Sequence, residues 1–142
     1  MKSKIQQNSI SNLFVQICKH RRNKSNILLS EAGIHGGQDI LLYYLSIDDG
    51  QTVSALVEKM CIQHATISTM IDRVEATGML IKVKDTLDKR ISRVFITDKG
   101  NEAYKQIAKI WKVMEAAVTK GLTEHQEGLL RELLQQVLKN LT

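Results

Sequence analysis

Apolar side chains recur at helical spacing along most of the chain. Near its start, five of them fall at positions i, i+3, i+4, i+7 and i+8: Ile10, Leu13, Phe14, Ile17 and Cys18. This stripe predicts an amphipathic helix, followed by a basic polar run over 19–26 that marks its end. A second apolar segment begins after residues 36–37, two glycines, and stops at residues 48–50, where Asp-Asp-Gly favours a turn.

The middle of the chain has the pattern of a helix-turn-helix. Thr52 is placed to cap a short helix over 53–60, and residues 61–63 form a tight connector. The next helix is predicted over 64–76, and Gly78 is placed to end it with left-handed backbone. Four side chains of this second helix are expected to face inward: Ile67, Met70, Ile71 and Val74. Two short helices with so brief a connection predict a helix-turn-helix.

Directly afterwards the hydrophobic pattern changes to the alternation of strands. Residues 81–84 alternate between apolar and polar, residues 93–96 do so less regularly, and the polar loop 85–90 separates them. Because a two-stranded hairpin is marginally stable alone in water, it is expected to pack on the preceding helices. A helix-turn-helix followed by a basic β-hairpin predicts a winged helix, in a fold that is mainly α with a small β-hairpin (α+β).

Two more helices are predicted after the hairpin. Thr97 is placed to cap a long one that ends at Gly121, and Thr123 with Gln126 forms a capping box for the last. The last helix carries one apolar stripe: Leu130, Leu133, Leu134, Val137, Leu138 and Leu141. This stripe and the one near the start both need a partner. A monomer could fold one on the other, or two copies could share them.

Composition supports this interpretation and excludes several function classes. The 142 residues fit one domain, Pro is absent and aromatic residues make up only 4%, which favours continuous helices. The formal charge of +5 permits a polyanionic partner without requiring one. No apolar run is long enough to span a membrane, and residues 1–8 turn polar where a signal peptide is apolar. We therefore expect a cytoplasmic protein.

Motifs for metal binding and catalysis are missing from the sequence. Cys18 and Cys61 lie far apart without metal-type spacing, and the four histidines show no i, i+4 pairing, so no metal or cofactor is expected. The sequence also contains no Gly-rich phosphate loop, His-x-x-Glu pattern or nucleophile elbow. An enzyme is therefore not expected.

Three short segments resemble the pattern of MarR-family transcriptional regulators. They are Gly78-Met79-Leu80-Ile81-Lys82, Asp88-Lys89-Arg90 and Ile96-Thr97-Asp98-Lys99-Gly100. The order of elements matches the family from Ile5 to Leu141. Met79 and Ile96 replace the commoner Leu, which a core tolerates, and Gln63 replaces the usual Ser or Asp cap of the recognition helix.

The resemblance implies one MarR-type domain over 5–141. Segments 1–35 and 101–142 would supply dimerisation helices, and 52–100 the DNA-binding winged helix. It further implies a homodimeric repressor that binds an inverted-repeat operator in double-stranded DNA and responds to a small-molecule effector. Two half-sites about one helical turn apart would add to the specificity of each module.

The expected DNA contacts lie on the recognition helix and the wing. At about 100° per residue, the face opposite the core carries Ala65, Thr69, Asp72 and Ala76. The candidate contacts on the helix and beside this face are His64, Ala65, Thr66, Ser68, Thr69 and Arg73. Asp72 would oppose phosphate, so we interpret it as structural and paired with a nearby Arg.

On the wing, the candidate contacts are Lys84, Lys89, Arg90 and Arg93. Arg90 resembles the family's wing arginine that enters the minor groove, where a narrow A·T-rich groove attracts a guanidinium. Asp88 is interpreted as an acceptor at the hairpin tip that aims Arg90.

The resemblance also implies an effector pocket between the dimer base and the winged helix. Its candidate residues are Ile17, His35, Tyr43, Tyr44 and Trp111, although aromatic residues at helical spacing also fit a core. Cys18 has two interpretations: an inert thiol buried on the apolar stripe, or a redox sensor activated by the basic residues that follow it.

One alternative function is a winged helix that binds protein instead of DNA. The basic residues of the wing favour DNA, whereas Asp72, Asp85 and Asp88 leave room for the alternative.

Overall fold

The computed structural model describes residues 7–142, so the expected domain start at Ile5 and the first six residues of the segment 1–35 lie outside the described part. The elements follow one another as α2 (Ile10–Glu31), α3 (Gln38–Ile47), β1 (Gln51–Thr52), α4 (Val53–Met60), α5 (His64–Ala76), β2 (Leu80–Lys84), β3 (Ser92–Ile96), α6 (Asp98–Thr119) and α7 (Glu124–Leu141). The expected fold class, mainly α with a small antiparallel sheet, is confirmed.

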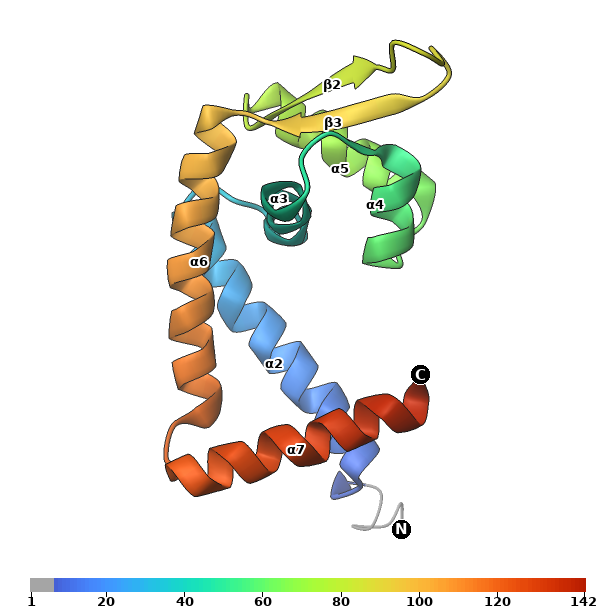
Figure 1. Ribbon diagram of the computed structural model, residues 1–142. Coiled ribbons are helices and arrows are strands. Elements are labelled where there is room, and N and C mark those ends of the chain that lie inside the picture. The colour runs from blue at the N-terminus through green and yellow to red at the C-terminus, as the bar shows by residue number, and fades with distance from the viewer. Residues whose placement is uncertain (1–6) are drawn as a thin grey trace.

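The winged helix forms around a single apolar cluster. In Figure 1, α3, α4, α5 and the strands lie together at the top, and α2, α6 and α7 extend below them. The buried apolar residues of this cluster are Leu29, Ile34, Leu41, Leu42, Leu45, Leu56, Ile67, Ile71, Val74, Met79, Leu80, Val94 and Ile107. Leu29 and Ile107 show that α2 and α6 also reach into it, so the long helices are anchored to the winged helix at their upper ends.

Helix α2 is longer than the sequence predicts. It continues from Ile10 through the whole basic run to Glu31, so the expected end at residues 19–26 is wrong. The run contains neither Pro nor Gly, and Lys and Arg are good helix formers. The inward face is carried by Ser25, near the end of the run, and by Leu29, beyond it; these are the buried residues of this helix. A polar run therefore marked a solvated stretch of helix, not its end.

The predicted caps are confirmed at three helices. The side-chain oxygen of Thr52 accepts a hydrogen bond from Ala55 N, and that of Thr97 accepts one from Gly100 N, both at 3.1 Å. Thr123 forms the full capping box with Gln126 at the start of α7. As the sequence indicated, Gln63 makes no side-chain cap to α5.

The sheet has one more strand than the predicted hairpin. β3 lies between β2 and the two-residue strand β1, all antiparallel, with Leu80 opposite Ile96 and Gln51 opposite Val94. A strand of two residues has no periodicity that a sequence pattern could reveal. Because β1 leads straight into α4, its pairing with β3 fixes the start of the helix-turn-helix to the wing.

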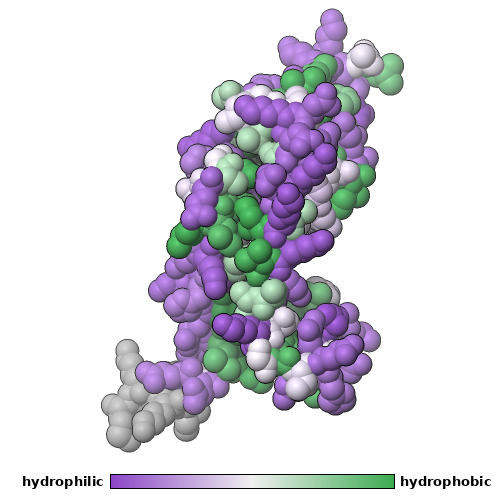
Figure 2. Space-filling model, turned by 90° about the vertical axis from the view of Figure 1, so that its left-hand side faces the viewer, coloured by the Kyte–Doolittle hydropathy of each residue, from purple (hydrophilic) through white to green (hydrophobic). Residues whose placement is uncertain are grey.

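The terminal helices leave much apolar surface open. α7 buries none of its side chains, and its exposed leucines are Leu129, Leu133, Leu134, Leu138 and Leu141. The N-terminal half of α2 exposes Ile10, Leu13, Val15 and Ile17 as well. Figure 2 shows hydrophobic surface between polar side chains at mid-height and in the lower part of one face. Within residues 7–142, no helix is long and apolar enough to cross a membrane.

Candidate nucleic-acid interface

Helix α5 turns the predicted face outward. Ile67, Ile71 and Val74 are fully buried, as expected, whereas Met70 is half-buried. The exposed residues on the other side of the helix include the candidates His64, Ala65, Thr66, Thr69 and Arg73, and the candidate Ser68 is half-buried beside them. The expected orientation of the helix is therefore confirmed, while the contacts of these side chains with DNA stay a prediction.

The entrance to α5 is set by a left-handed residue. Cys61 ends α4 with φ 52° and ψ 38°, the only residue other than Gly with positive φ in the part of the chain that the structure describes. Asn and Gly tolerate this region better than Cys, so the position is mildly strained. The resulting tight turn lets α4 and α5 pack against each other within three connecting residues.

Two carboxylates of α5 hold the first strand of the wing. Asp72 pairs with Lys82 Nζ at 3.0 Å, and Glu75 accepts a hydrogen bond from the backbone N–H of Lys82 at 2.6 Å. The expected partner of Asp72, an arginine, is therefore wrong: the partner is a lysine of β2. Periodicity could not identify it, because the two residues lie ten positions apart on different elements. These contacts set the wing relative to the recognition helix.

At the wing tip, Asp88 binds Arg90 through both carboxylate oxygens. Oδ1 accepts from the backbone N–H and Nε of Arg90, and Oδ2 accepts from Nη2, all at 3.0 Å. These hydrogen bonds, first those of the side chain, lower the pKa of Asp88 and raise that of Arg90. The Arg90 side chain nevertheless stays 91% exposed. This is the geometry expected of an acceptor that aims the arginine outward.

Arg93 has a different environment, near the start of β3, where the strands of the wing leave the tip loop. Its Nε donates to Asp85 Oδ1 at 2.8 Å, and its Nη1 donates to the carbonyl of Gly50 at 3.0 Å. Hydrogen bonding to Arg93 is also the main cause that lowers the pKa of Asp85. Arg93 thus joins β3 to the turn before β1. By contrast, Lys84 and Lys89 point to solvent as exposed side chains.

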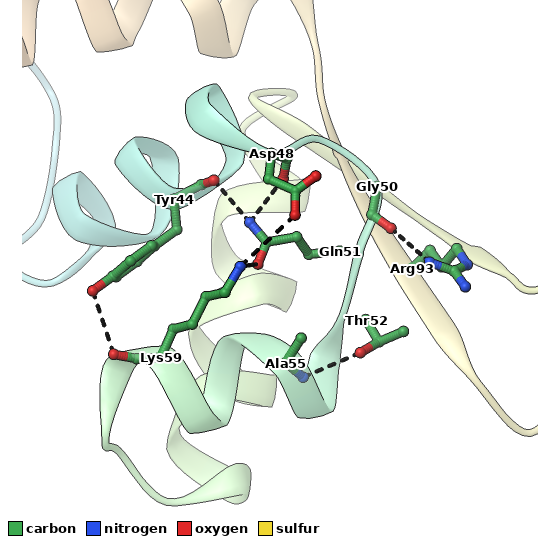
Figure 3. A network of polar contacts seen from close by, with 8 residues as sticks. All are labelled: Tyr44, Asp48, Gly50, Gln51, Thr52, Ala55, Lys59 and Arg93. Atoms are coloured by element: carbon green, nitrogen blue, oxygen red, sulfur yellow. Dashed lines mark hydrogen bonds and ion pairs between the residues drawn. The ribbon is translucent and has the colours of Figure 1, made fainter.

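A polar network that the sequence did not reveal holds α3 and α4 together (Figure 3). The side chain of Gln51, itself only 5% exposed, donates to the carbonyls of Tyr44 at 2.8 Å and Asp48 at 2.7 Å. Its Oε1 accepts from Lys59 Nζ at 2.6 Å, and the Tyr44 hydroxyl donates to the Lys59 carbonyl. A buried Gln has no sequence signature, because its partners are defined only by folding.

The five effector-pocket candidates do not line one cavity among the described residues. Tyr43, Tyr44 and Trp111 pack as an aromatic cluster, with ring centroids 5.3 Å apart from Tyr43 to each of the others. Ile17 is exposed on α2, and His35 lies beside α5, in a hollow with Arg73 and Thr69. The aromatic candidates therefore occupy positions typical of core packing.

Cys18 is exposed, so its expected burial on the apolar stripe is wrong for the single chain. The N-terminal half of α2 extends away from the winged helix (Figure 1), and nothing in the described chain covers this part of the stripe. Cys18 lines a hollow of about 510 Å³ between α2 and the start of α3, together with Arg21, Arg22 and Asp39. Asp39 is itself held there by the indole N–H of Trp111, at 3.1 Å.

Comparison with known proteins assigns this architecture to a family. Residues 40–92 match the model of the MarR family. The chain is 25% identical over 117 residues to YybA of Bacillus subtilis, an uncharacterized HTH-type transcriptional regulator, covering 82% of this chain and 78% of that protein. It is also 30% identical over 101 residues to YwaE of Bacillus subtilis, another uncharacterized HTH-type transcriptional regulator. This match covers 71% of this chain and 59% of YwaE.

Solved structures agree in fold. A putative MarR family transcriptional regulator from Listeria monocytogenes, complexed with a 26mer DNA, superimposes with a TM-score of 0.81 at 28% identity over 94% of this chain and 89% of that one. A crystal structure of MarR superimposes with a TM-score of 0.83 at 19% identity, over 99% of this chain and 93% of that one. At this identity the similarity is one of fold alone.

Proposed function

The chain belongs to the MarR family of transcriptional regulators, and from this premise we propose that it is a sequence-specific, homodimeric DNA-binding repressor acting in the cytoplasm. The observation that carries the proposal is the link between α5 and the wing: β2 packs against α5, and the backbone N–H of Lys82 donates to Glu75, with the exposed Asp72–Lys82 pair beside it. This link fixes the position of the wing relative to α5, and these are the two elements that would contact DNA. The Listeria relative in complex with DNA supports the same assignment.

In this proposal α5 enters the major groove and the wing tip enters the neighbouring minor groove. Thr66, Thr69 and Arg73 are exposed on α5, where hydroxyls and a guanidinium suit base edges and phosphates. Arg90 is the exposed cation of the wing tip, suited to a narrow A·T-rich minor groove. We assign Arg93 a supporting role, because both of its described hydrogen bonds go to the protein itself.

Dimerisation is proposed through segments 7–35 and 101–142, with 52–100 as the DNA-binding part of a single domain. The support is the apolar surface of α7, a helix of 18 residues without a buried side chain, and of the first half of α2. Exposed apolar surface on this scale is typical of an interface. A dimer would present two recognition helices to the two halves of an inverted repeat.

A small-molecule effector belongs to the proposal by family resemblance. The hollow between α2 and α3, with Arg21, Arg22 and Asp39 in its wall, offers room for a polar ligand next to the winged helix. A ligand there would act by favouring one spacing of the two winged helices over another. Redox control through the exposed Cys18 is the competing mechanism. Release of the operator by an organic hydroperoxide, lost in Cys18→Ser, would select it.

A mobility-shift titration tests DNA binding against the alternative of a protein-interaction module. The alternative rested on Asp72, Asp85 and Asp88, but each of these carboxylates is paired with a cation of the protein. We expect the protein to bind a duplex that contains an inverted repeat from upstream of its own gene, with affinity that falls steeply between 50 and 200 mM salt, as counterion release requires. Binding that is insensitive to salt, or absent, would contradict the proposal.

A further inference from the structure

A polar crevice of about 220 Å³ lies between the recognition helix and the wing. Its walls come from the start of α4, one side of α5, and the wing strands with their tip. The lining residues are Thr52, Val53, Ser54, His64, Ser68, Ile71, Lys82, Arg90, Ile91 and Ser92. The crevice thus adjoins both parts of the molecule that the proposed function brings to DNA.

Seven of the ten side chains that line the crevice are of kinds that bind phosphate. Four of the lining residues carry hydroxyls, one carries an imidazole, and Lys82 and Arg90 are cationic. None of the described residues that line it is acidic. Hydroxyls, lysines and arginines are the usual protein donors to the phosphate oxygens of nucleic acids. The crevice is therefore complementary to an anion with several oxygen acceptors.

Two of the four hydroxyls have no hydrogen bond at all within the described residues. The Thr52 hydroxyl oxygen accepts from Ala55 N as the cap of α4, and the hydroxyl of Ser68 lies 3.3 Å from Nδ1 of His64. The hydroxyls of Ser54 and Ser92 form no hydrogen bond with any residue of 7–142. Ser54 is exposed in the first turn of α4 and Ser92 begins β3, so the two free donors come from different elements.

The two cations remain able to attract a phosphate although each has a carboxylate partner. Lys82 pairs with Asp72 and keeps 37% of its side chain exposed; Arg90 pairs with Asp88 and keeps 91% exposed. Ion pairs this accessible to water contribute little, so their cations can share or exchange a partner at low cost. Nη1 of Arg90, moreover, has no hydrogen bond within residues 7–142.

The path of DNA across a winged helix leads to this crevice. With α5 in the major groove and Arg90 in the adjacent minor groove, the sugar-phosphate strand that separates the two grooves has to pass between helix and wing tip. The crevice occupies that gap, since His64 and Ser68 of α5 line it together with Arg90 of the wing. A phosphate of that strand is therefore the anion brought closest to it.

We propose that this crevice seats one backbone phosphate of the DNA strand between the two grooves, with Ser54 and Ser92 as hydrogen-bond donors and Lys82 as the cation. The inference rests on the proposed function and assigns to it a contact outside the base-reading face. A phosphate held there by α4 and by the wing would fix the register of the module on DNA. It would add affinity equally for all sequences, because phosphates carry no base identity.

The decisive variant is Ser54→Asp. Asp at the second position of a helix is favoured by the helix dipole, so we expect α4 to stay folded and the unfolding temperature to be unchanged or raised. The new carboxylate would repel the phosphate, and affinity should fall about tenfold or more, equally for the operator and for an unrelated duplex. Ser54→Ala, which removes only the donor, should weaken both about two- to tenfold.

Ser46→Asp is the control for charge, because Ser46 is exposed on α3, does not line the crevice and lies outside the segments proposed for DNA binding and dimerisation. It should bind both duplexes as the unaltered protein does. Equal losses in the two Asp variants would reduce the effect to net charge and overturn the inference. So would wild-type affinity in Ser54→Asp, or a loss confined to the operator. Failure of the unaltered protein to bind any duplex would instead contradict the proposed function itself.

A modified duplex identifies the phosphate. Neutral methylphosphonates are placed one at a time along the strand between the half-site and its flanking minor groove. At the seated position, we expect the substitution to weaken the unaltered protein but to remove most of the difference between it and Ser54→Asp. If the difference persists at every position, the crevice does not hold a backbone phosphate.

Discussion

Asp88 and Arg90 act as one unit at the tip of the wing, and Arg93 acts with Asp85 where the strands join the tip loop. The two arginines lie three residues apart, yet the Arg90 side chain is 91% exposed and that of Arg93 only 43%. The difference arises because Arg93 reaches across β3 to the carbonyl of Gly50, whereas Arg90 is bound only by its neighbour in the turn. Exposure together with orientation makes Arg90 the arginine that we expect to contact DNA.

Arg90→Ala tests this assignment. The substitution removes a guanidinium that packs on nothing but Asp88, so the unfolding temperature should change little. Affinity should fall roughly ten- to a hundredfold, mainly through A·T-rich positions that flank the half-sites. Fluorescence anisotropy on duplexes with varied flanks measures both effects. Lys105→Ala removes an exposed cation from α6 and should bind normally. An Arg90→Ala protein with unchanged flank preference would show that the wing does not read DNA.

The carboxylates of the wing should titrate at unusually low pH. Hydrogen bonds from Arg93 lower the pKa of Asp85 below 3.8. Because a lowered pKa in the folded state stabilises the charged form, the contribution to stability is complete above pH 3.8 and is lost as the pH falls through the lowered value. Carboxyl chemical shifts in an NMR titration report it. In Arg93→Gln the pKa of Asp85 should return toward 3.8 while that of Asp88 stays low; a value for Asp85 that does not move would contradict the pairing.

Among the elements, the junction of wing and long helix is the most constrained. α6 begins where Thr97 donates from its hydroxyl to the Gly78 carbonyl at 2.6 Å and from its backbone to the Met79 carbonyl at 3.1 Å. One turn later, Gly100 lies so close that a Cβ atom there would collide with the Met79 carbonyl and with Ile96. The Thr-x-x-Gly segment is thus a packing device that brings the helix against the start of the wing.

Gly100→Ala should therefore destabilise the protein. The added methyl group meets backbone, which cannot move aside cheaply, and we expect a loss of about 1–3 kcal/mol in the free energy of unfolding, measured by urea denaturation. Gly128→Ala is the control: it is also inside a helix, α7, and a Cβ there meets nothing within 4 Å, so the higher helix propensity of Ala should leave stability unchanged or raise it. Equal stability of the two variants would contradict the close approach at Gly100.

At the level of the whole molecule, two parts of different character are joined end to end. The winged helix has a complete core, whereas α7 and the first half of α2 bury almost nothing within the chain. Helices rarely persist in water without a packed face. In the proposed dimer, the second copy would cover this exposed apolar surface. The same contact would set the distance between the two recognition helices.

The double variant Leu134→Glu with Leu138→Glu tests whether a second copy packs on the apolar surface of α7. Two carboxylates buried in a seam would cost several kcal/mol, so sedimentation at micromolar concentration should show monomer or unfolded chain in place of dimer. Gln136→Glu with Asn140→Glu adds the same charge to the other side of α7 and should stay dimeric. A folded dimer in the leucine variant would remove α7 from the interface.

Much of this architecture was predictable from local patterns. The turn after α4, the bounds of α5 at His64 and Ala76, the caps at Thr52 and Thr97, and the outward face of the recognition helix all follow from residues within a few positions of one another. Helix spacing, capping and left-handed glycines depend on such neighbours alone, so the sequence by itself determined the winged helix and the position of its candidate DNA-reading residues.

Only the tertiary structure decided which charges pair and which elements stay uncovered. Lys82 as the partner of Asp72, Gln51 as a bridge between α3 and α4, and the third strand β1 join residues that lie apart in the sequence or are too few to show a period. The polar run of α2 misled for a related reason: a helix continues through charged residues when packing further along, at Leu29, holds it. Periodicity in the sequence shows which side of a helix or strand is apolar. Which residues contact that side depends on which elements lie beside it in the folded chain.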